Sequence, residues 1–87
     1  MSKFSFETDR QAEEFCTEIA KMMVKLFGIT EIEAVGRINR QWQGQKIVGP
    51  NRMIYHEDTE FWAKTIYYGA DVHWWRGEEG LEPQPFP

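Results

Sequence analysis

The chain has 87 residues and a mass of 10.3 kDa, which limits it to one small domain and excludes architectures that need about 150 residues or more. Hydrophobic residues make up 41% and aromatic residues 15% of the sequence, and this composition excludes a largely disordered chain. The formal charge of −4 argues against a wholly basic nucleic-acid binder, although residues 34–56 carry four bases and no acid.

The first predicted element is an amphipathic helix that ends at Gly28. Apolar residues alternate at spacings of four and three, as expected for one helical face: Ala12, Cys16, Ile19, Met23 and Leu26. Thr8 or Ser5 is expected to cap the start of this helix with its hydroxyl. Gly28 is expected to end it, because a residue without Cβ adopts the left-handed conformation at low cost.

The second predicted helix begins at Thr30. The Thr30 hydroxyl is placed to accept from the N–H of Glu33, and the Glu33 carboxylate to reach back to the N–H of Thr30. One face carries Ile32, Val35, Ile38 and Trp42, and Gly44 is the expected end. Gly36 costs the helix about 1 kcal/mol relative to Ala, which indicates either close approach of another element or simple tolerance. Asn39 lies on the core side, and the polar loop that follows is the expected source of partners for its amide.

Between the second and third helices, residues 45–55 contain two short apolar runs separated by a turn-rich tetrad at 49–52. This pattern predicts either a small β-hairpin or an extended loop. The third helix is expected to begin at Asp58 or Thr59 and to run to Tyr68, with Gly69 as its exit.

The predicted fold is therefore mainly α. We expect a single three-helix domain over residues 1–76, with a short β-hairpin or extended loop between helices two and three. Residues 77–87 have the Gly, Glu and Pro composition of a flexible C-terminal tail. No internal repeat divides the chain.

The most unusual feature is the distribution of large rings, because every Trp and Tyr lies between Trp42 and Trp75. They either form the core of a domain too small to rely on aliphatic residues, or leave some rings exposed as a contact patch. The sequence predicts a non-catalytic interaction or regulatory module that acts through a protein partner or as a homodimer. Its predicted partner-binding residues are three rings and three arginines: Trp74, Trp75, Tyr68, Arg37, Arg40 and Arg52. The rings would be apolar anchors, and the arginines would orient an acidic partner.

An alternative interpretation is a winged helix-turn-helix DNA-binding protein. Residues 26–30, followed by a capped helix, resemble the turn of such a module, and a hairpin would serve as its wing. The supporting cations are Arg37, Arg40, Lys46 and Arg52. However, Glu31 and Glu33 occupy the start of the helix that would read the groove, where carboxylates oppose the approach of phosphate. A nucleic-acid partner is therefore disfavoured.

A third and less favoured interpretation is a metal-dependent enzyme that uses His56 and Glu60, with Asp71 and His73 downstream. The pattern is not that of a zinc protease, because Glu60 stands where the second histidine is required. The simpler interpretation is that acids in this stretch cap the third helix. Cys16 lies in the core register, where a small buried thiol is expected. We therefore expect no enzymatic activity, no cofactor and no metal.

The cellular setting follows from what the sequence lacks. One cysteine forms no internal disulfide, and no apolar run resembles a secretory signal or a membrane span. The expected localisation is cytoplasmic, without a membrane partner.

Overall fold

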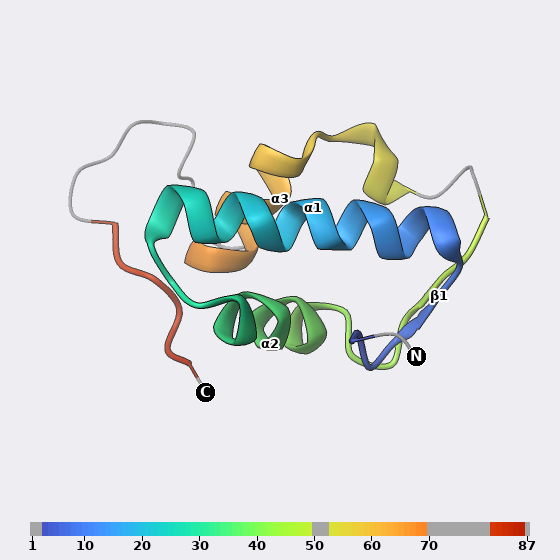
Figure 1. The fold of residues 1–87 in the computed structure, drawn as a ribbon, viewed down its shortest axis with the longest axis horizontal. Coiled ribbons are helices and arrows are strands. Elements are labelled where there is room, and N and C mark those ends of the chain that lie inside the picture. The colour runs from blue at the N-terminus through green and yellow to red at the C-terminus, as the bar shows by residue number, and fades with distance from the viewer. Residues whose placement is uncertain (1–2, 50–52, 70–80, 87) are drawn as a thin grey trace.

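The computed structural model describes residues 3–49, 53–69 and 81–86. Within these ranges the elements follow in this order: β1 (Glu7–Thr8), α1 (Arg10–Phe27), α2 (Glu31–Gln41), β2 (Lys46–Ile47), a 3₁₀ helix (Met53–His56) and α3 (Thr59–Tyr68) (Figure 1). The predicted mainly α fold with three helices is confirmed.

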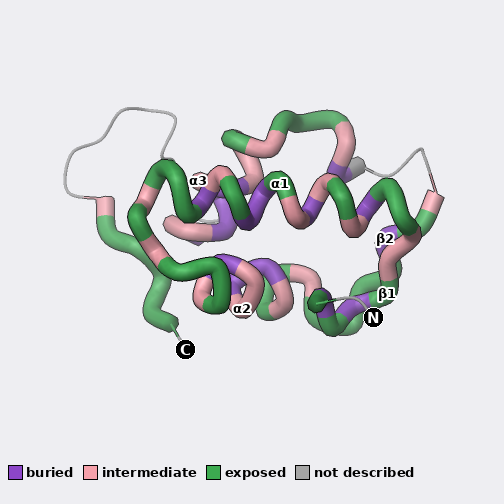
Figure 2. Tube along the Cα trace, viewed as in Figure 1, coloured by how far each residue is buried: buried purple, intermediate pink, exposed green. Residues whose placement is uncertain are grey.

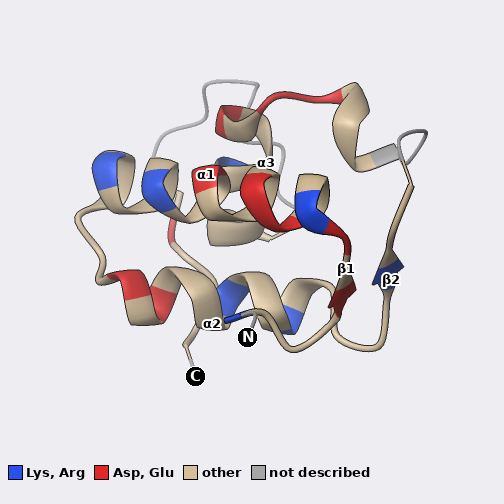
Figure 3. Cartoon of the chain, turned by 45° about the vertical axis from the view of Figure 1, so that its right-hand side comes forward, with Lys and Arg blue, Asp and Glu red and all other residues tan. Residues whose placement is uncertain are grey.

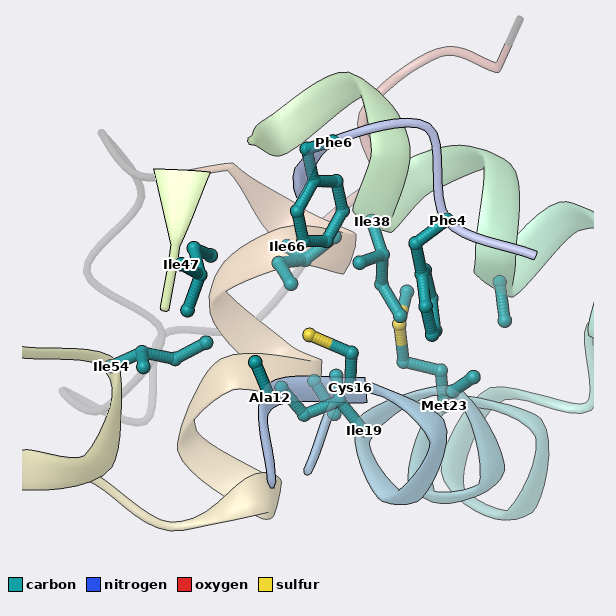
Figure 4. Close-up of a cluster of buried hydrophobic side chains, with 13 residues drawn as sticks. Phe4, Phe6, Ala12, Cys16, Ile19, Met23, Ile38, Ile47, Ile54 and Ile66 are labelled. Carbon is teal, nitrogen blue, oxygen red and sulfur yellow. The ribbon is translucent and has the colours of Figure 1, made fainter. Parts of the chain in front are cut away.

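Helix α1 is the centre of the fold, since both α2 and α3 pack against it and contact each other less extensively. The buried residues lie where these helices face one another, as the colours of Figure 2 indicate, and Figure 4 shows their side chains gathered in one cluster. Four of the five residues of the predicted stripe are fully buried: Ala12, Cys16, Ile19 and Met23. Leu26, the fifth, is 39% exposed, so its predicted place in the core is wrong. It lies in the last turn of α1, two residues before the chain turns away at Gly28.

The start of α1 is capped by Asp9, not by Thr8 or Ser5. One Asp9 carboxylate oxygen accepts from the N–H of Ala12 and the other from the N–H of Gly49, each at 2.8 Å. These two backbone donors lower the pKa of Asp9. Thr8 is unavailable as the cap because it belongs to β1. Asp9 thus joins the first helix to the loop after β2.

The predicted hairpin does not form in the described residues, where the extended alternative is found. β2 pairs with β1 in parallel, with Glu7 opposite Lys46 and Thr8 opposite Ile47. The second apolar run contributes to a 3₁₀ helix instead of a return strand. The N-terminal segment therefore supplies the pairing partner that a hairpin would have supplied locally.

Helix α2 begins as predicted, with the Thr30 hydroxyl accepting from the N–H of Glu33 at 3.1 Å. The Glu33 carboxylate, however, accepts from Arg37 and not from Thr30. The helix ends at Gln41, before the predicted Gly44. Ile32 was expected on the core face but is 85% exposed, because the helix turns Ala34 and Ile38 towards α1.

Asn39 is held by the N-terminal segment and not by the loop that follows α2, so that prediction is wrong. Its Oδ1 accepts from the N–H of Ser5 at 2.9 Å, and its Nδ2 donates to the carbonyl of Lys3 at 3.5 Å. On either side of Ser5, Phe4 and Phe6 are each only 5% exposed. Figure 4 shows both rings directed into the cluster between the helices.

Helix α3 matches its prediction at both ends. Asp58 caps it by accepting from the N–H of Phe61 at 2.8 Å, and Gly69 follows its last residue. The described Trp and Tyr side chains are all half-buried and pack on other rings: Trp42, Tyr55, Trp62, Tyr67 and Tyr68. Four of these rings pack against the core, whereas Tyr68 packs against the rings of Phe27 and Tyr67.

Candidate functional site

The predicted partner-binding residues are only partly within the described chain. Trp74, Trp75 and Arg52 lie outside the described residues. Tyr68, at the end of α3, packs edge-on against Phe27, with ring centroids 5.6 Å apart. Its predicted role as an anchor stays a prediction. Arg37 and Arg40 lie on α2 and have well-defined contacts.

Arg37 is a buried residue and not a surface cation, since only 5% of it is exposed. Its Nε donates to the Glu33 carboxylate at 2.8 Å. Its Nη1 donates to the carbonyl oxygen of Gln84, also at 2.8 Å. The guanidinium lies 4.9 Å from the ring centroid of Tyr67 on α3. Arg37 therefore links α2, α3 and the C-terminal residues of the chain.

Arg40, almost one helical turn farther along α2, binds the same C-terminal residues. Its Nη1 donates to the carbonyl oxygen of Pro85 at 2.7 Å. Both guanidinium groups also face the ring of Phe86, at 5.3 Å for Arg37 and 5.4 Å for Arg40. Cations at such distances are attracted to the negative face of an aromatic ring. Two arginines thus hold two consecutive carbonyls and the ring that follows them.

Two glycines allow the C-terminal residues to approach the helices. A Cβ on Gly36 would overlap the Phe86 ring, and a Cβ on Gly69 would overlap the side-chain amide of Gln84. Gly69 also has φ of 105°, where other residues are strained. Of the two explanations for Gly36 in mid-helix, close approach of another element is therefore the correct one.

We call residues 81–86 the docked segment and the residues that receive it the docking groove: Gly36, Arg37, Arg40, Tyr67 and Gly69. The N–H of Gln84 donates to the carbonyl of Tyr67 at 2.8 Å, which ties the segment to α3 as well as to α2. A cavity of about 190 Å³ remains beside Gln84, between Arg40 and Ile66. Figure 1 shows the docked segment, in red, as an extended chain.

The chemistry of the docking groove is that of main-chain recognition. Pro83 and Pro85 have no N–H, so Gln84 supplies the only backbone donor of these three residues, and that donor is bonded. The carbonyls of Gln84 and Pro85 both accept from charged donors, which form stronger hydrogen bonds than neutral ones. Proline also restricts φ, so an extended chain loses little freedom on binding.

The docked segment falls within the predicted C-terminal tail, residues 77–87. Its contacts show where residues 81–86 lie, and the flexibility of the tail stays a prediction. The groove residues Tyr67 and Gly69 and the docked Gln84 were missed from the sequence. The available signals were a glycine in mid-helix and a Pro-Gln-Pro-Phe stretch near the end.

Within the described residues, the features that suggested DNA binding do not form one exposed basic strip. Arg37 is buried and paired with Glu33, while Glu31 pairs with Lys3 at 3.3 Å. Figure 3 shows acids in the first turn of α2 ahead of its arginines. The paired strands replace the hairpin that would have been a wing. In the part of the chain that the structure describes, these observations do not support a recognition helix with a wing, and the DNA-binding interpretation stays an untested prediction.

The described residues contain no group of three or more His, Cys, Asp or Glu side chains that could hold a metal ion. His56 is exposed, and Glu60 pairs with Lys64 at 3.4 Å on α3. Asp71 and His73 lie outside the described residues. The candidate ligands therefore share no site within residues 3–49, 53–69 and 81–86.

Cys16 is fully buried in the core, as predicted. Burial, with a smaller contribution from the nearby charge of Glu13, raises the pKa of the thiol to about 12. Because the thiolate is the reactive form, this thiol is a poor nucleophile at neutral pH.

None of the helices in the described ranges combines the length and apolar character needed to cross a membrane. Comparison with known proteins finds no match: no family model, curated protein or solved structure is similar to this chain.

Proposed function

We propose that this protein is a non-catalytic interaction module that binds an extended segment of a partner protein in the docking groove. One observation carries the proposal: Arg37 and Arg40 hold consecutive main-chain carbonyls of an extended chain and face the ring beside them. The two carbonyls are features of every peptide, while the ring adds selectivity. The site therefore has the elements of peptide recognition.

The electrostatics of the groove favour a neutral or acidic ligand. The charge of Arg37 is compensated by Glu33 at 2.8 Å. Among the described residues, Arg40 forms no such ion pair, and its charge is the one left to orient an acidic partner. Arginine and tyrosine are also enriched at the energetic centres of protein interfaces. The predicted aromatic and basic surface is thus proposed at the junction of α2 and α3.

The proposal is tested by selecting a displayed random peptide library on the full chain. Selected peptides are expected to bind Arg40→Ala at least about tenfold more weakly than wild type, since a charge-assisted hydrogen bond and a ring contact are lost. The matched control is Arg10→Ala, which removes an exposed arginine from α1. Measuring the solution mass with and without peptide would identify self-association.

Two outcomes would contradict the proposal. One is a selection that enriches no peptide. The other is a set of peptides whose affinity is unchanged by Arg40→Ala, because their binding site would then lie elsewhere. Thermal unfolding of both variants shows whether a loss of affinity reflects a loss of structure.

A further inference from the structure

We infer that the ligands of the docking groove are extended Pro-x-Pro-aromatic segments, and that residues 81–86 are a built-in competitor for them. This inference rests on the proposed function. It adds the chemical class of the ligand and a regulation by the chain's own docked segment.

The aromatic requirement follows from Gly36 and the two guanidinium groups. The absence of a side chain at Gly36 leaves room for the outer edge of the Phe86 ring, whose Cζ is the atom that a Cβ at Gly36 would overlap. Arg37 and Arg40 both face this ring within 5.4 Å, and an aliphatic side chain would lose that attraction. The space over Gly36, between the two guanidinium groups, therefore selects for an aromatic residue.

The proline requirement follows from the hydrogen bonds of the docked segment. The groove offers a backbone acceptor, the carbonyl of Tyr67, and the single N–H of Pro83-Gln84-Pro85 uses it. Prolines on both sides of Gln84 leave no further donor to satisfy and restrict the unbound chain. A ligand with the same spacing matches the groove at the least entropic cost.

The docked segment is held in a way that allows competition. Phe86 remains 36% exposed, and residues 82–86 are all exposed. Three backbone hydrogen bonds fix the segment, one to each of Arg37, Arg40 and Tyr67. The docked segment belongs to the same chain as the groove, so it binds intramolecularly and competes at every protein concentration. An external peptide must displace it, which reduces the apparent affinity.

The experiment compares two full-length receptors, wild type and Phe86→Ala, by fluorescence anisotropy. The probe is a labelled peptide with the sequence of residues 81–87, and the control peptide has alanine in place of Phe86. Phe86→Ala weakens the competitor and leaves the groove intact, so we expect it to bind the probe at least about tenfold more tightly than wild type does. Both receptors are expected to bind the control peptide at least about tenfold more weakly than the probe.

Two further variants of the full chain serve as controls. Glu82→Ala changes an exposed side chain of the docked segment and should leave the wild-type affinity unchanged. Gly36→Ala fills the space over Gly36 that the aromatic ring of either the docked segment or the probe would occupy, so probe binding should be lost. Thermal unfolding of this variant, followed by circular dichroism, tests whether the helix still forms.

Each contrary outcome has a distinct meaning. Equal affinity of wild type and Phe86→Ala for the probe would overturn the competition. Equal affinity for probe and control peptide would overturn the aromatic requirement. No probe binding to either receptor would overturn the whole inference, while library peptides that depend on Arg40 would still support the proposed function.

Discussion

The two terminal segments of this protein both pack beside α2, but they are held by different forces. In the N-terminal segment, Phe4 and Phe6 are each 5% exposed and reach the core between the helices. In the C-terminal docked segment, Phe86 is 36% exposed and lies over Gly36. The first segment is fixed mainly by buried apolar surface, with hydrogen bonds to Asn39, and the second mainly by backbone hydrogen bonds and by the contacts of Phe86 with two arginines.

This difference separates a structural segment from a ligand-like one. A fully buried aromatic side chain contributes roughly 1.5–3 kcal/mol through removal from water. A hydrogen bond contributes only about 0.5–1.5 kcal/mol net, because it replaces bonds to water. Loss of the N-terminal contacts should therefore unfold the domain, whereas loss of the C-terminal contacts should release a segment from a folded domain.

The largest effect expected is that of Phe6→Ala. Removing this ring leaves a cavity beside Trp42, whose ring centroid lies 5.8 Å away, and should lower the free energy of unfolding by about 3–5 kcal/mol. Phe86→Ala should lower it by less, about 1.4–2 kcal/mol, which is the free-energy equivalent of a roughly ten- to thirtyfold weaker docking of this partly exposed ring. Urea unfolding measures both values. Similar losses for the two variants would contradict the distinction between the segments.

The sequence was sufficient for the elements whose signals are local. Asp58 and Gly69 mark the ends of α3 because a cap and an exit glycine act within one helical turn. The fold class followed from three such helices. Phe4 and Phe6 were missed because two rings in a short extended segment have no helical period.

The docking groove could not be predicted because its contacts are far apart in the sequence. In the sequence, Arg37 and Glu33 are four residues apart and look like residues of an exposed charged helix face. The carbonyl of Gln84, 47 residues farther along the chain, accepts a hydrogen bond from Arg37, whose side chain is buried. Gly36 indicated a close approach but not which element would make it. Local patterns thus predicted the helices, while the residues that meet in the groove required the tertiary structure.

The next effect in size concerns the polar attachment of the N-terminal segment. Asn39→Ala removes the bonds to Ser5 and Lys3 and should destabilise the domain by about 1–2 kcal/mol. The amide of Ser5 should then exchange with solvent faster. Gln43→Ala is the matched control, since it removes an exposed amide close to the end of α2. An equal effect of both variants would mean that Asn39 does not hold the segment.

Gly36→Ala should change the free energy of unfolding less than Asn39→Ala does. Its main effect should be local, on the contacts of the docked segment. Alanine favours the helix by about 1 kcal/mol, while its Cβ displaces Phe86, so the free energy of unfolding should change by less than about 1 kcal/mol. Hydrogen exchange at the Gln84 amide should accelerate, because its bond to Tyr67 is released together with the ring. Unchanged hydrogen exchange at the Gln84 amide would show that docking of the segment does not depend on the space over Gly36.

The smallest change at neutral pH is expected for Asp9→Asn, because asparagine is also a good N-cap for α1. The effect of Asp9→Asn on the free energy of unfolding should appear at low pH. The N–H groups of Gly49 and Ala12 lower the pKa of Asp9 in the folded state, so the unfolded chain takes up its proton first as pH falls. The stabilisation by Asp9 is therefore complete above its ordinary pKa of 3.8 and is lost as the pH falls through the lower folded value. Urea unfolding at pH 7 and pH 3 should show a smaller loss for Asp9→Asn than for wild type. If wild type and Asp9→Asn lost the same free energy of unfolding between pH 7 and pH 3, carboxylates other than Asp9 would be responsible for the loss. The contact of Asp9 with α1 and Gly49 would then not be the one that acid weakens.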